Sequence, residues 1–127
     1  MTNYTYFANV LCIQSEIEIP ELPISNETPT IFIKLGNTPE KIENATLARG
    51  IQQLNDKEYL LDIQHAARYW VKNKNEVIVE PYAGVQSEAV RIYILSSVMG
   101  VLLHMNDCLP IHSCCIKVND KVFLVAG

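Results

Sequence analysis

The stretch from Ala89 to Met105 constrains this chain more than any other, because apolar residues recur along it at helical spacing. Val90 and Ile94 begin a stripe that further leucines, isoleucines and methionines widen almost all the way round the predicted helix. Ser87 is a good N-cap residue at its start, and Pro110 cannot continue it at its end. So broad an apolar surface indicates either a helix buried at the centre of a fold or a membrane span.

Polar residues within this helix favour the buried alternative. Arg91, Ser96, Ser97 and His104 interrupt the apolar run, and no basic loop flanks it, as would be expected beside a membrane span. We therefore expect the helix to be the central packing element of the fold, with no membrane partner. Gly100 near its middle predicts a close helix contact.

The region before this helix is rich in β-type runs separated by proline, glycine and asparagine. Asn73–Asn75 supplies turn residues between two of these runs, which predicts a hairpin. Residues 38–50 fit either a short helix or a charged loop. We expect a mainly antiparallel β-unit, with strands at residues 4–13, 16–19, 30–35, 58–63, 67–72 and 76–80.

After the helix, two further β-type runs at residues 111–118 and 121–125 flank the turn residues Asn119 and Asp120. The predicted fold class is therefore α+β: an antiparallel β-unit, one long buried helix and a C-terminal β-hairpin. We expect residues 1–86 to form a strand-rich accessory domain, and residues 87–127 to form the helix and the first hairpin of a second domain.

Composition excludes several classes of protein. The 10 basic and 14 acidic residues give a net charge of −4, whereas a protein that coats nucleic acid carries a basic surplus. Hydrophobic residues make up 49% and charged residues 19%, which is typical of a folded domain rather than a disordered chain. We therefore expect no nucleic-acid partner.

The cysteines and the N-terminus both point to the cytoplasm. Cys12, Cys108, Cys114 and Cys115 form no C-x-x-C pair, so the spacing predicts no zinc site, and core filling is the expected role of the thiols. The first residues lack the basic stretch and apolar run of a secretory signal. A reduced, cytoplasmic chain follows.

The three histidines differ in their surroundings. His65 follows a predicted strand and is expected at the surface. His104 falls in the last turn of the helix, where a protonated imidazole suits the negative end of the helix dipole. His112 opens the C-terminal hairpin, whose second strand is hydrophobic and runs into Ala126 and Gly127. A buried strand followed by glycine is the usual approach to a phosphate-binding loop, in which backbone N–H groups reach phosphate oxygens.

This tail resembles the entry to the kinase domain of HPr kinase/phosphorylase-like proteins. In that family a histidine opens a strand, a two-residue turn follows, and a hydrophobic strand runs into G-x-x-x-x-G-K-[ST]. Here His112 lies 15 residues before Gly127, which matches the family spacing. The resemblance covers roughly residues 58–127, whereas residues 1–57 match only in general character.

The resemblance implies a role for two residues. His112 matches the histidine that the family places near the transferred phosphate, and Gly127 matches the first glycine of the phosphate loop. The lysine that grips phosphate, the hydroxyl that holds Mg²⁺ and the acidic base would all lie beyond Gly127. We therefore expect an N-terminal fragment of an ATP-dependent serine kinase, in which the full-length parent uses ATP and Mg²⁺ and this chain alone binds neither and is inactive.

Two other functions remain open. The strand-rich first eighty residues could form a non-enzymatic module that binds a partner peptide or protein by edge-strand pairing. They could also form a purely structural domain, and exposed strand edges would then promote a homo-oligomer. The phosphate acceptor of the kinase alternative would be a protein, a peptide or a small molecule.

Overall fold

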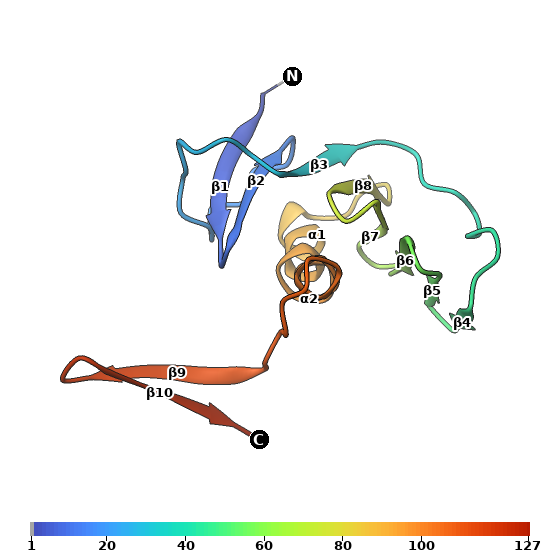
Figure 1. Cartoon of the computed structure of the whole chain (residues 1–127). Helices are drawn as coiled ribbons and strands as arrows, with labels where there is room; N and C mark the ends of the chain where they lie inside the picture. Colours follow the sequence, from blue (N-terminus) through green and yellow to red (C-terminus); the bar gives the residue numbers. More distant parts are fainter. Residues whose placement is uncertain (1) are drawn as a thin grey trace.

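In the computed structural model, which describes residues 2–127, eight strands form a single sheet that curves around one helix (Figure 1). The strand order is β1-β2-β3-β8-β7-β6-β5-β4. Neighbours are antiparallel except that β3 runs parallel to both β2 and β8. The α+β class with a mostly antiparallel sheet is thereby confirmed. The strands of the sheet are β1 Tyr4–Ala8, β2 Leu11–Ser15, β3 Ile31–Leu35, β4 Leu47–Arg49, β5 Gln52–Leu54, β6 Glu58–Asp62, β7 Ala67–Lys72 and β8 Glu76–Pro81.

The centre of the sheet follows the sequence pattern closely. Strands β6, β7 and β8 lie where the three β-type runs predict them, and β7 alternates strictly between buried and half-buried residues. Asn73 and Lys74 both adopt positive φ, at 53° and 66°, in the turn between β7 and β8. Such angles suit the tight turns that match the twist of paired strands. The predicted hairpin is confirmed.

The N-terminal strands differ from the prediction. The single strand expected over residues 4–13 is wrong, because Asn9 takes a positive φ of 56° and the chain folds back into the hairpin β1–β2. The strand expected over residues 16–19 is also absent. The hydroxyl of Ser15 donates to the carbonyl oxygen of Ile17 and accepts from its backbone N–H, at 2.7 and 3.0 Å, which turns the chain out of the sheet.

Residues 36–46 form a strap across the outer face of the sheet, so the loop alternative for this region is confirmed up to β4. The side-chain carboxylate of Glu80 accepts hydrogen bonds from the backbone N–H and hydroxyl of Thr38, at 2.8 and 2.6 Å. Arg68 donates to the carbonyl oxygens of Pro39 and Glu40. The Thr38 hydroxyl is the main reason that the pKa of Glu80 lies below its ordinary value.

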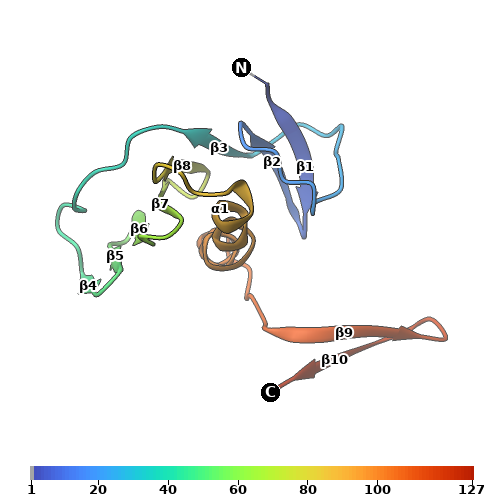
Figure 2. The same cartoon turned by 180° about the vertical axis from the view of Figure 1, so that it is seen from behind.

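One helix lies in the concave face of the sheet (Figure 2) and consists of α1 Ser87–Tyr93, η1 Ile94–Val98 and α2 Met99–Met105. Its N-cap is Gln86 rather than Ser87, which is already helical. Length and composition alone would let Ser87–Met105 cross a membrane. Here one face packs against the sheet, through Val90, Ile94, Val98, Met99 and Leu102.

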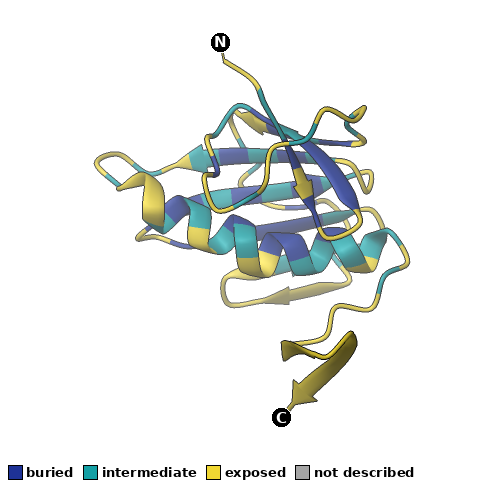
Figure 3. Cartoon of the chain, turned by 90° about the vertical axis from the view of Figure 1, so that its left-hand side faces the viewer, coloured by how far each residue is buried: buried dark blue, intermediate teal, exposed yellow. Residues whose placement is uncertain are grey.

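The burial of this helix is one-sided, which differs from the expectation of burial nearly all round. The sheet curves over one side of the helix only (Figure 3). Ile92 is accordingly 60% exposed. The middle segment η1 is a π turn, in which the N–H of Met99 bonds the carbonyl oxygen of Ile94 five residues earlier. Such turns are rare inserts in α-helices and are frequent at functional sites.

The C-terminal hairpin consists of β9 Ser113–Val118 and β10 Lys121–Ala126, as predicted. It forms a separate two-stranded sheet that stands away from the curved sheet and the helix (Figures 1 and 3). The helix thus shares a core with the curved sheet, whereas no residue of the hairpin belongs to the buried core of the described chain.

Candidate functional site

The strand register places the two predicted site residues at the same end of the hairpin. Ser113 pairs with Ala126 in the last rung between β9 and β10. His112 precedes this rung on one strand and Gly127 follows it on the other, and both are exposed. A ligand at the open end of the hairpin could therefore meet both residues.

The hairpin carries apolar side chains on both of its faces. Because successive strand residues alternate in direction, Val122 and Leu124 share one face while Phe123 and Val125 share the other. These four side chains are 52–62% exposed. Strands that are apolar on both faces are typical of sheets covered by a layer on each side. A two-stranded hairpin is also marginally stable by itself.

The other two histidines lie on the helix side of the curved sheet. The Nε2 atom of His65 is 2.9 Å from the hydroxyl of Tyr93, and His65 is exposed, as predicted. His104 lies in the last turn of α2, also as predicted. His104 is exposed and borders the main pocket of the molecule.

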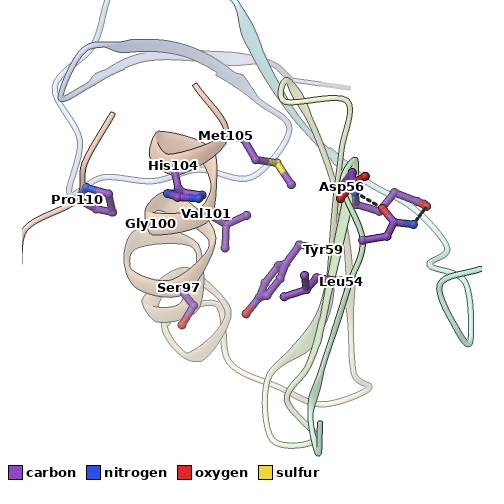
Figure 4. A pocket seen from close by; sticks show the side chains of 11 residues that line it. Leu54, Asp56, Tyr59, Ser97, Gly100, Val101, His104, Met105 and Pro110 are labelled. Carbon is purple, nitrogen blue, oxygen red and sulfur yellow. Dashed lines mark hydrogen bonds between the residues drawn. The ribbon is translucent and has the colours of Figure 1, made fainter. Parts of the chain in front are cut away.

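This pocket, of about 560 Å³, lies between α2 and the turn that joins β5 to β6 (Figure 4). Its volume falls within the range of about 300–1,000 Å³ that is usual for ligand sites. Figure 4 shows side chains from the helix on one side and from β5 and β6 on the other. The lining residues are Leu54, Asn55, Asp56, Glu58, Tyr59, Ser97, Gly100, Val101, His104, Met105 and Pro110.

Tyr59 lines this pocket, and its residue is only 6% exposed. Its hydroxyl makes no hydrogen bond to residues 2–127, but it is not buried, because Nε of Arg68 is the only buried side-chain nitrogen or oxygen without a partner in this part of the chain. The hydroxyls of Tyr6, Tyr69, Tyr82 and Tyr93 all have one. Burial raises the pKa of Tyr59, so its phenol stays protonated and can donate a hydrogen bond.

Gly100 forms the part of the pocket wall that the helix contributes at its middle. A Cβ atom added to it would meet nothing within 4 Å, so the close helix contact predicted for this glycine is wrong. Glycine inside a helix costs about 1 kcal/mol relative to alanine. Because Gly100 has no side chain, space remains between the helix and the sheet at this position, and the two do not pack closely there.

The turn at the other wall is acidic and held rigidly. Asn55 Oδ1 accepts from the backbone N–H groups of Lys57 and Glu58, at 2.9 and 2.8 Å. Glu58 in turn accepts from Asn55 Nδ2 and Trp70 Nε1, and Lys72 lies opposite it on β7. A second hollow of about 350 Å³ shares Asn55, Asp56 and Glu58 with the main pocket and extends to Glu43.

The cysteines behave differently from one another. Cys12 is buried, as core filling predicts, whereas Cys114 and Cys115 are exposed on the hairpin, so core filling is wrong for these two in the described chain. Among residues 2–127 no group of three or more histidine, cysteine or acidic side chains could hold a metal ion.

Comparison with known proteins adds nothing to this geometry. No family model, no curated protein and no solved structure matches the chain.

Sequence reasoning singled out His104 and Gly100 but not the pocket they border. Tyr59 lies within an ordinary strand run, and the sequence indicated no role for residues 55–57. The signal that could have indicated the pocket is the spacing of Ser97, Gly100 and His104, because small or polar residues at helical spacing interrupt an otherwise apolar helix.

Proposed function

We propose that this chain is the N-terminal part of an ATP-dependent, HPr-kinase-like serine kinase that acts in the cytoplasm. In this proposal the curved sheet and helix form the accessory region, and the hairpin β9–β10 opens the P-loop catalytic domain. The parent protein would use ATP and Mg²⁺ and phosphorylate a protein, peptide or small molecule. The chain from Met1 to Gly127 would be inactive alone, because it lacks the lysine and hydroxyl that phosphoryl transfer requires.

The observation that carries the proposal is the form of the hairpin. Its apolar residues face both ways, as expected of strands inside a larger α/β sheet, and its register puts His112 beside Gly127 at one end. A phosphate loop that continued from Gly127 would begin next to the imidazole of His112. The proposed role of His112 is to contact or orient the transferred phosphoryl group.

The test is a protein extended through the codons that follow Gly127 in the gene. A G-K-[ST] sequence at the family spacing, together with Mg²⁺-dependent ATP turnover, is expected. His112→Ala should then lower turnover, whereas His65→Ala, which changes a surface histidine on the curved sheet, should not. Unchanged turnover in His112→Ala would remove that residue from the mechanism, and a sequence without G-K-[ST] would overturn the kinase proposal.

A binding module is the second candidate, and the edges of the curved sheet favour it. The outer edge of β1 is covered, because Phe7 donates to the carbonyl oxygen of Pro23 and Ser25 donates to that of Thr5. The opposite edge, β4, has no such neighbour among the described residues and is exposed throughout. A peptide strand could pair there, and codons after Gly127 that lack G-K-[ST] would favour this candidate.

A further inference from the structure

We infer that the strap of residues 36–46 is a lid that opens while the sheet stays folded, because the charged residues that hold it closed have alternative partners beneath it. The strap joins β3 to β4 on the side of the sheet away from the helix (Figure 1). The proposed movement involves neither the hairpin nor His112, so it is independent of the proposed function.

Three charged side chains form a row beneath the strap. Asp62, Arg68 and Glu80 lie directly opposite one another on β6, β7 and β8. All three are half-buried, and they alternate with the strand residues that face the helix. Side chains that oppose each other directly in a sheet are close enough to interact, and opposite charges then attract. The register by itself would therefore pair Arg68 with either carboxylate.

With the strap closed, hydrogen bonds to the strap replace these pairings. Arg68 donates to the neutral carbonyl oxygens of Pro39 and Glu40, at 2.7 and 3.1 Å. The carboxylate of Glu80 accepts from the backbone N–H and the hydroxyl of Thr38. The strap thus takes up the hydrogen-bonding groups of the cation and of one neighbouring anion.

The Nε atom of Arg68 is an independent indication that the closed state carries a cost. It is buried without a hydrogen-bond partner, which holds for no other side-chain nitrogen or oxygen in residues 2–127. The Oδ2 atom of Asp62 lies 3.6 Å away, beyond hydrogen-bonding distance, while Oδ1 accepts from the hydroxyl of Tyr82. A buried N–H without a partner is destabilising, and a small movement toward Asp62 would satisfy it.

Opening the strap would exchange bonds to neutral groups for bonds between charged ones. Once released from Pro39 and Glu40, the Arg68 guanidinium can bond the carboxylates on either side of it, and such charge-assisted bonds are the stronger kind. Ile42 is the one buried side chain of the strap, and it does not belong to the main core. Little apolar contact is therefore lost, as is typical of segments that open locally.

The test is amide hydrogen exchange of the 127-residue chain, followed residue by residue in NMR spectra. The backbone N–H groups of Thr38 and Ile42 both bond side chains of the sheet, so their exchange requires the strap to open. We expect them to exchange at least about ten-fold faster than the amide of Tyr69, which lies in the middle of β7. Low concentrations of urea should accelerate exchange at Tyr69 more strongly, because its exposure requires more of the fold to open.

Two variants should change the opening in opposite directions. Asp62→Asn removes a charge that attracts Arg68 more strongly in the open state, while its amide oxygen still accepts the hydrogen bond from Tyr82. Exchange at Ile42 should become slower by about two- to five-fold. Thr38→Val removes a hydroxyl bond that exists only in the closed state, so exchange at Ile42 should become faster by about two- to ten-fold.

The matched control is Glu76→Gln, which neutralises a carboxylate on the same face of the sheet. Glu76 bonds Lys34 and Lys72 and makes no hydrogen bond to residues 36–46. Exchange at Ile42 should be the same in this variant as in the unmodified chain.

The direction of the Asp62→Asn effect decides between a lid and an ordinary loop. If Asp62 only supported Arg68 in the closed state, removing its charge would speed the opening or leave it unchanged, and either result would overturn the inference. Exchange of Thr38 and Ile42 at the rate of Tyr69 would also overturn it, because the strap would then open only on global unfolding. None of these results bears on ATP turnover by the extended protein, so the two proposals fail separately.

Discussion

The phenol of Tyr69 donates a 2.9 Å hydrogen bond to the backbone carbonyl of Val90, inside the core. Tyr69 lies in the middle of the curved sheet and is fully buried, and its burial raises the pKa of the phenol. Tyr69→Phe should lower the free energy of unfolding by about 1 kcal/mol, because one buried hydrogen bond is lost while the ring remains. Urea denaturation measures this. Tyr4→Phe is the control, since the Tyr4 hydroxyl has no partner among residues 2–127.

A second prediction concerns pH. The carboxylate of Glu76 lies 2.7 Å from the ammonium of Lys72 and 3.1 Å from that of Lys34. The hydrogen bond from Lys72 is the main reason that the pKa of Glu76 lies below 4.5, followed by that from Lys34. A lowered pKa means that the carboxylate stabilises the fold above its ordinary pKa, and that this contribution disappears as the pH falls through the folded value.

Glu76→Gln should therefore reduce the free energy of unfolding by about 0.5 kcal/mol at neutral pH and low salt, since the pair is partly exposed. The difference between the two proteins should shrink toward zero as the carboxyl becomes protonated, and in high salt. Denaturant midpoints measured across the acid range would show it. A difference that grew on acidification would contradict the assignment.

A third prediction uses two glycines that differ in backbone conformation. Gly100→Ala should raise the free energy of unfolding by about 0.5–1 kcal/mol, because the position is helical and has room for a methyl group. Gly84 adopts a positive φ of 76° before the helix, so Gly84→Ala should be destabilising although it too has open space around it. Thermal midpoints of the pair compare them directly, and equal effects would refute the conformational argument.

A fourth prediction concerns association through the hairpin. Exposed apolar faces and unpaired edges on β9 and β10 should make the 127-residue chain self-associate as its concentration rises. Phe123→Lys should shift the chain toward the monomer in light scattering. The surface variant Glu27→Gln should leave the association unchanged, and a chain that stays monomeric at millimolar concentration would contradict the prediction.

The sequence pattern predicted those elements whose residues repeat with a clear period. The alternation in β7 and the turn residues Asn73 and Lys74 located the central hairpin, and the helix spans Ser87–Met105 as its apolar spacing indicated. Local rules of this kind depend on neighbours in sequence, so they need no knowledge of the tertiary structure.

What the pattern could not predict depends on contacts between distant residues. The strap at residues 36–46 has no period of its own and is held by Glu80 and Arg68, which lie well over twenty residues further along. The apolar width of the helix suggested burial all round, yet the sheet covers one side only. The pocket residue Tyr59 resembled any other strand residue, because only the fold places it at the wall of a pocket.

The π turn at Ile94–Val98 sets the phase of everything that follows it in the helix. A π turn holds five residues in about the rotation that four residues make in an α-helix, so deleting one residue there would restore a regular helix and leave α2 facing the sheet as before. Deleting a residue within α2 itself would instead turn every later residue of the helix by about 100°. His104 would then leave the pocket wall, whereas a deletion inside the π turn would keep it there.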